Sequence, residues 1–212
     1  MNPADFAVLF LLNLAGVITP GPDVVLITRL ATRSRKHAAA ASLGISLGAL
    51  MWITLTVLGA AAVWTAFPRV LVLLQVIGGA WIVFMGVAMV RQGMRDRGRP
   101  PADLQDAVDR LGSVRAAFFT GLATNLSNPK IVLFLAALIA PLLPPSPSLG
   151  TALLVIVALW LPALLIFLLI SVVVSTKRVR RKLLGAGPSI DIGAGAFFIA
   201  AGSGLVIRGV TG

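Results

Sequence analysis

Two charged residues lie inside apolar stretches of this chain, and each directly follows a proline: Asp23 follows Pro22, and Lys130 follows Pro129. A charged side chain in the hydrocarbon of a bilayer costs roughly 3 kcal/mol or more, so it usually faces a protein-lined cavity or a transport path. A carboxylate binds an ammonium group or a proton, and an ammonium group binds a carboxylate. Together the two residues predict a site for the charged ends of an amino-acid zwitterion.

The first charge belongs to a segment that interrupts a helix. Pro22 has no N–H for the helical ladder, Gly21 takes backbone angles that other residues avoid, and Pro20 disfavours a helical conformation of the residue before it. The helix is therefore expected to open, and the segment forms one half of the predicted substrate site: Thr19, Pro20, Gly21, Pro22 and Asp23. Asp23 is also the predicted proton-coupling residue, because few other titratable groups lie in the apolar stretches.

The second charge follows a similar interruption. Asn128 is a good N-cap and Pro129 suits the first position of a new helix, whose amide groups and positive dipole end favour a carboxylate. The other half of the predicted substrate site is Asn125, Asn128, Pro129 and Lys130. Structural roles stay open: Asp23 can cap a helix, Lys130 can extend toward an interface, and the two can form an ion pair that only joins the halves.

Composition places these residues in a membrane protein. The chain is 58% hydrophobic and 12% charged, with a mean hydropathy of +0.99. It has no Cys and no Glu, and its one His is His37, so we predict no cofactor, no metal site and no enzymatic activity. The net charge of +11 lies in loops, which indicates membrane topology rather than nucleic acid. No Lys or Arg precedes the first apolar stretch, so we expect it to stay as a membrane helix.

Six apolar stretches of membrane-spanning length predict an all-α integral membrane protein. They fall at about residues 5–28, 39–66, 70–90, 115–143, 149–175 and 189–209. Of the 18 Lys and Arg residues, 15 lie in or beside alternate loops, which the positive-inside rule assigns to the cytoplasm, with both termini outside. A version with five spans and one re-entrant segment is the alternative.

The chain also carries an internal repeat. Gly79-Ala80-Trp81 corresponds to Gly195-Ala196-Phe197, with a second Gly seven residues after the first in each case, and Ser42-Leu43-Gly44 corresponds to Ser148-Leu149-Gly150. Three spans per half is an odd number, so the halves are expected to form an inverted repeat, as in alternating-access carriers whose halves tip against each other. We predict a first repeat at 1–94, a cytoplasmic linker at 95–113 and a second repeat at 114–212. The linker is either a short helix at the membrane surface or a solvated segment.

On these motifs the chain resembles the LysE/RhtB family of bacterial amino-acid exporters. The matching features are Pro-Gly-Pro at 20–22, Gly44 and Gly48, and Asn128-Pro129-Lys130. The resemblance implies export of amino acids across the bacterial inner membrane by proton antiport, with functional positions at Pro20, Gly21, Pro22, Asp23, Asn128, Pro129 and Lys130. The two glycines predict close packing of another helix, within the protomer or across a homodimer.

We therefore predict a secondary active exporter that works by alternating access. The chain has no phosphate-binding motif for ATP, so an ion gradient must drive it. A neutral or hydroxylated substrate, such as threonine or homoserine, is favoured, because a dibasic one would want a second buried acid and the sequence shows none. The predicted partners are the amino acid, protons and the lipid bilayer, with no nucleic acid. The alternatives are a cation or heavy-metal exporter and a non-transporting membrane assembly protein.

Overall fold

A computed structural model describes residues 3–18, 21–60, 68–98, 104–135, 139, 142–143, 147–177, 179 and 187–211. Within these ranges the chain forms helices and no strands, which confirms the predicted all-α class. The helices are α1 (Pro3–Ile18), α2 (Pro22–Arg33), α3 (Arg35–Leu55) with the short π-helical segment η1 (Thr56–Ala60), α5 (Pro68–Gly98), α6 (Leu104–Asp109), α7 (Val114–Leu126), α8 (Pro129–Phe134), α9 (Leu149–Val174) and α11 (Gly187–Thr211).

Four helices in the described ranges are long and apolar enough to cross a membrane, and α1 with α2 makes a fifth span if the bent pair is counted as one. The fourth predicted span, 115–143, corresponds to α7, α8 and a segment that includes undescribed residues. The chain is thus an integral membrane protein, and its sixth span stays a prediction. α2 and α5 run past their predicted ends at 28 and 90. The extensions carry Arg29, Arg33 and Asp96, which are paired inside the protein, whereas Arg91, Arg95 and Arg97 of α5 are exposed.

Both predicted interruptions separate two helices. α1 ends at Ile18 and α2 begins at Pro22, with a bend of 52° between the two helices. α7 ends at Leu126, and α8 begins at Pro129 behind the N-cap Asn128, whose side chain accepts a hydrogen bond from the backbone N–H of Lys130. The first residue of a helix has no intrahelical partner for its N–H, so a proline, which lacks that group, is well suited to this position. Pro22 and Pro129 therefore each begin a new helix, and neither is a kink inside a continuous one.

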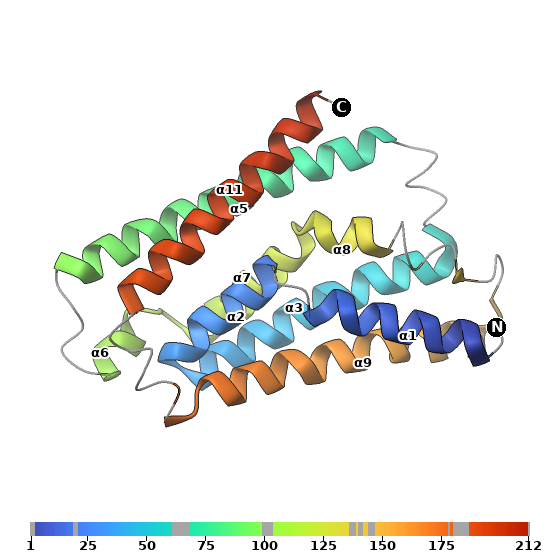
Figure 1. Ribbon diagram of the computed structural model, residues 1–212, viewed down its shortest axis with the longest axis horizontal. Helices are drawn as coiled ribbons and strands as arrows, with labels where there is room; N and C mark the ends of the chain where they lie inside the picture. The colour runs from blue at the N-terminus through green and yellow to red at the C-terminus, as the bar shows by residue number, and fades with distance from the viewer. Residues whose placement is uncertain are drawn as a thin grey trace.

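The helices form two layers (Figure 1). α5 and α11 pack along each other as an antiparallel pair, and α1, α2, α3, α7, α8 and α9 form a bundle beside them. Among the described residues of the bundle, α2 makes the main contact with α11. The last turns of α2, α5 and α9 lie at one end of the molecule with α6 and the first turns of α3, α7 and α11, at the left of Figure 1. We call this end the basic end.

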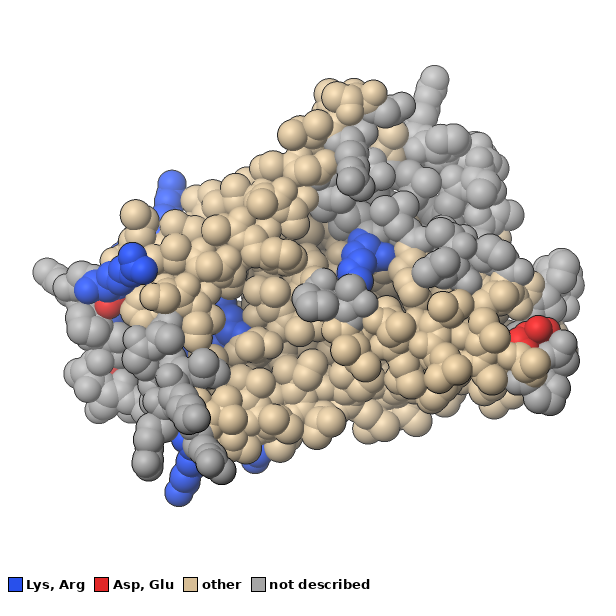
Figure 2. Space-filling view, viewed as in Figure 1, with Lys and Arg blue, Asp and Glu red and all other residues tan. Residues whose placement is uncertain are grey.

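The surface agrees with a membrane environment. Leu149, Leu165, Leu169 and Phe84 are each more than half exposed, and a bilayer is the solvent in which such apolar side chains are stable. Figure 2 shows most of the visible Lys and Arg atoms at the basic end and one further group near the middle, while most of the described surface on that face is uncharged. The helix α6 lies within the predicted linker, and its position at a membrane surface stays a prediction.

Glycines let α5 and α11 approach until their backbones touch. A Cβ atom added to Gly86 would lie 2.6 Å from the carbonyl oxygen of Gly195, and one added to Gly195 would lie 2.5 Å from the carbonyl oxygen of Gly86. Gly202 meets the carbonyl oxygen of Gly79 in the same way, again at 2.5 Å. In the sequence repeat, Gly79 corresponds to Gly195 and Gly86 to Gly202. Exchanging the two halves therefore turns one glycine contact into the other, which is the pattern of a two-fold axis.

We expect Gly195→Ala to destabilise the protein by about 2 kcal/mol, because its Cβ overlaps the α5 backbone and the two helices must separate. The measurement is the thermal unfolding midpoint of the purified protein in detergent. Gly193→Ala is the matched control, since its Cβ would meet no atom within 4 Å and it lies on the same helix. Equal midpoints for the two variants would contradict this account of the helix pair.

Candidate functional site

A cavity of about 60 Å³ lies where the two helix breaks meet. Its polar lining comes from Asn13, Asp23, Asn125, Asn128 and Lys130, so the predicted carboxylate and ammonium group border the same space. Its apolar lining includes Val17, Ala49, Ile53, Phe134, Ala163 and Phe167. A water molecule needs about 15 Å³ by this measure, so the space holds about four waters and suits a small solute.

The carboxylate of Asp23 is held by two amides from the other half of the chain. Its Oδ2 accepts hydrogen bonds from Nδ2 of Asn125 at 3.0 Å and from Nδ2 of Asn128 at 3.1 Å. The residue is 8% exposed, and its Oδ1 is buried with no hydrogen-bond partner among the described residues. Oδ1 of Asn125 is likewise buried with no hydrogen-bond partner among the described residues. Two buried acceptors beside one cavity are what an ammonium group would satisfy.

Lys130 supplies the opposite charge at the start of α8. Its Nζ donates to the carbonyl oxygen of Gly16 at 3.0 Å. Gly16 lies in the last turn of α1, where the backbone carbonyl groups have no amide of the same helix as a partner. Gly21 leaves room for the lysine, since a Cβ there would lie 3.2 Å from Cδ of Lys130. Asn128 connects the two charges, because its Oδ1 accepts from the Lys130 backbone while its Nδ2 donates to Asp23.

The structure brings together five of the nine predicted site residues. Gly21, Asp23, Asn125, Asn128 and Lys130 all line the cavity. Pro22 and Pro129 begin α2 and α8, the side chain of Pro129 is not described, and Thr19 and Pro20 lie outside the described residues. Their roles stay predictions.

Sequence reasoning missed Asn13, which lines the cavity and donates from Nδ2 to the carbonyl oxygen of Leu159 at 2.9 Å. A polar residue in the apolar stretch at 5–28 was the available signal.

The side of the cavity formed by α3 and α7 depends on Gly44 and Gly48, the two glycines predicted to allow close helix packing. A Cβ added to Gly44 would overlap the carbonyl oxygen of Phe118, and one added to Gly121 would overlap that of Ala41. Gly48 lies against Asn125, with 2.8 Å between its added Cβ and Oδ1. The pair therefore packs within the protomer, where the close approach of α3 fixes the position of the amide that holds Asp23.

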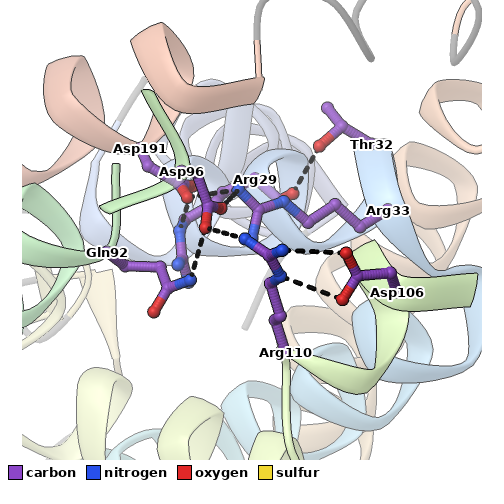
Figure 3. A network of polar contacts seen from close by, with 8 residues as sticks. All are labelled: Arg29, Thr32, Arg33, Gln92, Asp96, Asp106, Arg110 and Asp191. Atoms are coloured by element: carbon purple, nitrogen blue, oxygen red, sulfur yellow. Dashed lines mark hydrogen bonds and ion pairs between the residues drawn. The ribbon is translucent and has the colours of Figure 1, made fainter. Parts of the chain in front are cut away.

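The expectation that the sequence holds no second buried acid is wrong. Asp96 and Asp191 are 0% and 1% exposed, and both pair with arginines at the basic end (Figure 3). They do not line the cavity at Asp23. Asp191 lies within the apolar stretch at 189–209, which was the signal for it, whereas Asp96 stands among arginines in what hydropathy assigns to a loop.

An all-helical membrane chain with a small polar cavity at two broken helices has the features of a membrane translocator of small molecules. The family model for the LysE type translocator matches residues 14–209 of the chain. The chain belongs to this family, as the motifs predicted. The family is one of translocators, which agrees with the prediction that the chain is not an enzyme.

Relatives of similar length support the same grouping. The threonine efflux protein of Salmonella typhi is 25% identical over 203 residues, which cover 95% of this chain and 97% of the relative. An uncharacterized membrane protein of Haemophilus influenzae is 26% identical, with 95% and 96% covered, and one of Pseudomonas aeruginosa is 30% identical, with 84% of each chain covered. No solved structure matches the chain.

Proposed function

We propose that the chain exports a small amino acid, neutral or hydroxylated such as threonine or homoserine, from the bacterial cytoplasm. The observation that carries the proposal is the cavity that Asp23 and Lys130 share at the two helix breaks. The buried acceptors Oδ1 of Asp23 and Oδ1 of Asn125 would receive the substrate ammonium group. Lys130 and the amino end of α8 would receive the substrate carboxylate.

Two further observations support the substrate class. The chain is similar over nearly its whole length to proteins named threonine efflux protein. Apart from Asp23, the described residues that line the cavity include no acid, so a dibasic side chain would meet no second carboxylate among them. The small volume of the cavity favours a short side chain for the same site.

The proposal includes six membrane helices in two inverted repeats, 1–94 and 114–212, joined by the linker at 95–113, with both termini on the periplasmic side. The two-fold pattern of the α5–α11 contact supports this arrangement, because Gly86 meets Gly195 while Gly79 meets Gly202. An inverted repeat has two related conformations that open to opposite sides, which is the basis of alternating access. Asp23 is the proposed proton-coupling residue, since substrate and proton would compete for the same carboxylate.

The proposal is tested by counterflow of radiolabelled amino acids in proteoliposomes, first across a panel that compares threonine and homoserine with lysine. We expect Lys130→Met to lower counterflow by about tenfold, which is the loss of one charge-assisted hydrogen bond to the substrate carboxylate. Lys177→Met is the matched control, because Lys177 is exposed beyond the end of α9.

Two outcomes of these assays would count against parts of the proposal. No exchange of any amino acid by the folded protein would refute the exporter. Net uptake that is insensitive to an imposed pH gradient would remove proton antiport and leave the exporter in place.

A further inference from the structure

The basic end contains a cluster of six charges that the proposed substrate site does not use. Three of them are buried, at Arg33, Asp96 and Asp191, and the other three are partly exposed. Asp191 accepts from Nε of Arg29 at 2.7 Å and pairs with Arg33, while Asp96 pairs with Arg33 at 3.1 Å and with Nη1 of Arg110 at 2.8 Å. Arg110 also pairs with Asp106 at 2.8 Å. Figure 3 shows these side chains converging from α2, α5, α6 and α11. Three arginines and three aspartates balance in charge.

The cluster holds the far end of the helix that begins with Asp23. α2 has 12 residues, with Asp23 in its first turn and Arg29 and Arg33 in its last turns. The acids that hold these arginines stand on α5 and α11, and none of the side chains described on these two helices lines the cavity at Asp23. The ion pairs therefore tie a helix of the substrate site to the separate layer formed by α5 and α11.

The cluster differs from the glycine contacts between the halves of the chain in how readily its two sides can be separated. α3 meets α7, and α5 meets α11, through glycines at backbone contact, where there is no side chain to move. Buried ion pairs give little net stability over the same charges in water, so a cleft that admits water can separate them at modest cost. Hydrogen bonds to Asp106 and Asp96 raise the pKa of Arg110, so its guanidinium is charged while the cluster is closed.

A second cavity, of about 340 Å³, lies against the cluster. It follows the seam between α2 and α7, with Leu26 and Leu30 on one side and Ala117 and Thr120 on the other, and α5 covers it. Its charged and polar lining includes Arg29, Gln92 and Arg110. Further along the same seam lie Asp23 and Asn125, so this space leads from the basic end toward the substrate cavity.

We propose that the cluster of Arg29, Arg33, Arg110, Asp96, Asp106 and Asp191 is the gate at the cytoplasmic end, and that the larger cavity is the vestibule it closes. Separation of Arg33 from Asp96 and Asp191 frees the end of α2, which then tilts and opens a route from the cytoplasm to Asp23. The moving interface is the one between α2 and the α5–α11 pair, since the glycine contacts hold the two sequence halves together. The proposal rests on the exporter function proposed above.

The test uses the absence of cysteine from the chain, which makes any introduced thiol unique. Ala163→Cys places a reporter in the substrate cavity, at a side chain that is 4% exposed. In inside-out vesicles, we expect Asp191→Asn to raise the rate at which a membrane-impermeant thiol reagent modifies this cysteine by about tenfold, through a shift toward the open state. Asp109→Asn, at an exposed acid of α6, should leave the rate unchanged.

An unchanged rate in a folded Asp191→Asn protein would overturn the gate. Because Asp191→Asn leaves Arg33 short of a partner and can impair folding, a second arm uses Arg33→Cys with Asp191→Cys in the chain without the reporter. Bridging these thiols with a short bifunctional reagent should stop counterflow, and reductive cleavage should restore it. Counterflow that persists in the bridged protein would also overturn the gate. Thiol labelling needs no substrate, so it judges the gate even if the parent protein exchanges no amino acid.

Discussion

Replacing Asp23 by Asn is expected to lower amino-acid counterflow by about 10- to 100-fold, which corresponds to the loss of a hydrogen bond to a charged group in a buried site. Asn has the shape of Asp, and its remaining oxygen can still accept from Asn125 or Asn128. The protein should therefore fold and insert normally. The substrate ammonium group, however, would lose the only carboxylate that lines the cavity among the described residues.

Asp109→Asn is the control, because it removes a carboxylate of equal charge from an exposed position on α6. The measurement is the initial rate of threonine counterflow, normalised to the amount of protein in the proteoliposomes. A rate that is equal in Asp23→Asn and the parent protein would remove Asp23 from substrate binding. Net uptake driven by a pH gradient, measured on the same variant, then separates proton coupling from a purely structural role such as capping α2.

Replacing Gly44 by Ala is expected to destabilise the protein by about 3 kcal/mol. The added Cβ overlaps the carbonyl oxygen of Phe118 and would lie 2.8 Å from the backbone nitrogen of Leu122, so a whole helix must shift to make room. A shift of α7 also moves Asn125, which donates a hydrogen bond to Asp23. The fraction of Gly44→Ala protein that folds should therefore transport poorly. The measurements are the yield of monodisperse protein and its thermal unfolding midpoint.

Gly150→Ala is the matched control, because the internal repeat pairs Gly150 with Gly44 although nothing lies within 4 Å of a Cβ at Gly150. Ala is also the better helix former, so this variant should keep or raise the midpoint. Equal loss of stability in both variants would mean that the substitution acts on the helix itself and not on the α3–α7 crossing.

The comparison of Gly44 with Gly150 also shows how far the sequence repeat predicts structure. Both glycines stand in a Ser-Leu-Gly triplet, yet Gly44 is in backbone contact with α7 and Gly150 is open. The pairs Gly79 with Gly202 and Gly86 with Gly195, in contrast, make the same contact twice. Sequence similarity between two halves predicts corresponding elements, whereas the neighbours of each element depend on the conformation that the whole chain adopts.

The sequence by itself determined the membrane class, the helix breaks and the main polar residues of the cavity. These follow from local rules: hydrocarbon excludes charge, proline cannot continue a helical ladder, and Asn before Pro caps a new helix. Asp23 and Lys130 were therefore visible as a pair, with Asn125 and Asn128 beside them.

Only the tertiary structure decided which residues meet across the bundle. Asn13 joined the cavity, and Arg33 found Asp96 and Asp191 at sequence separations of 63 and 158 residues. Hydropathy assigns Arg33 and Asp96 to solvated loops, because it takes no account of which residues meet in space. Three helices that converge at one end can bury the same charges, since opposite charges placed in contact replace the water that each of them loses.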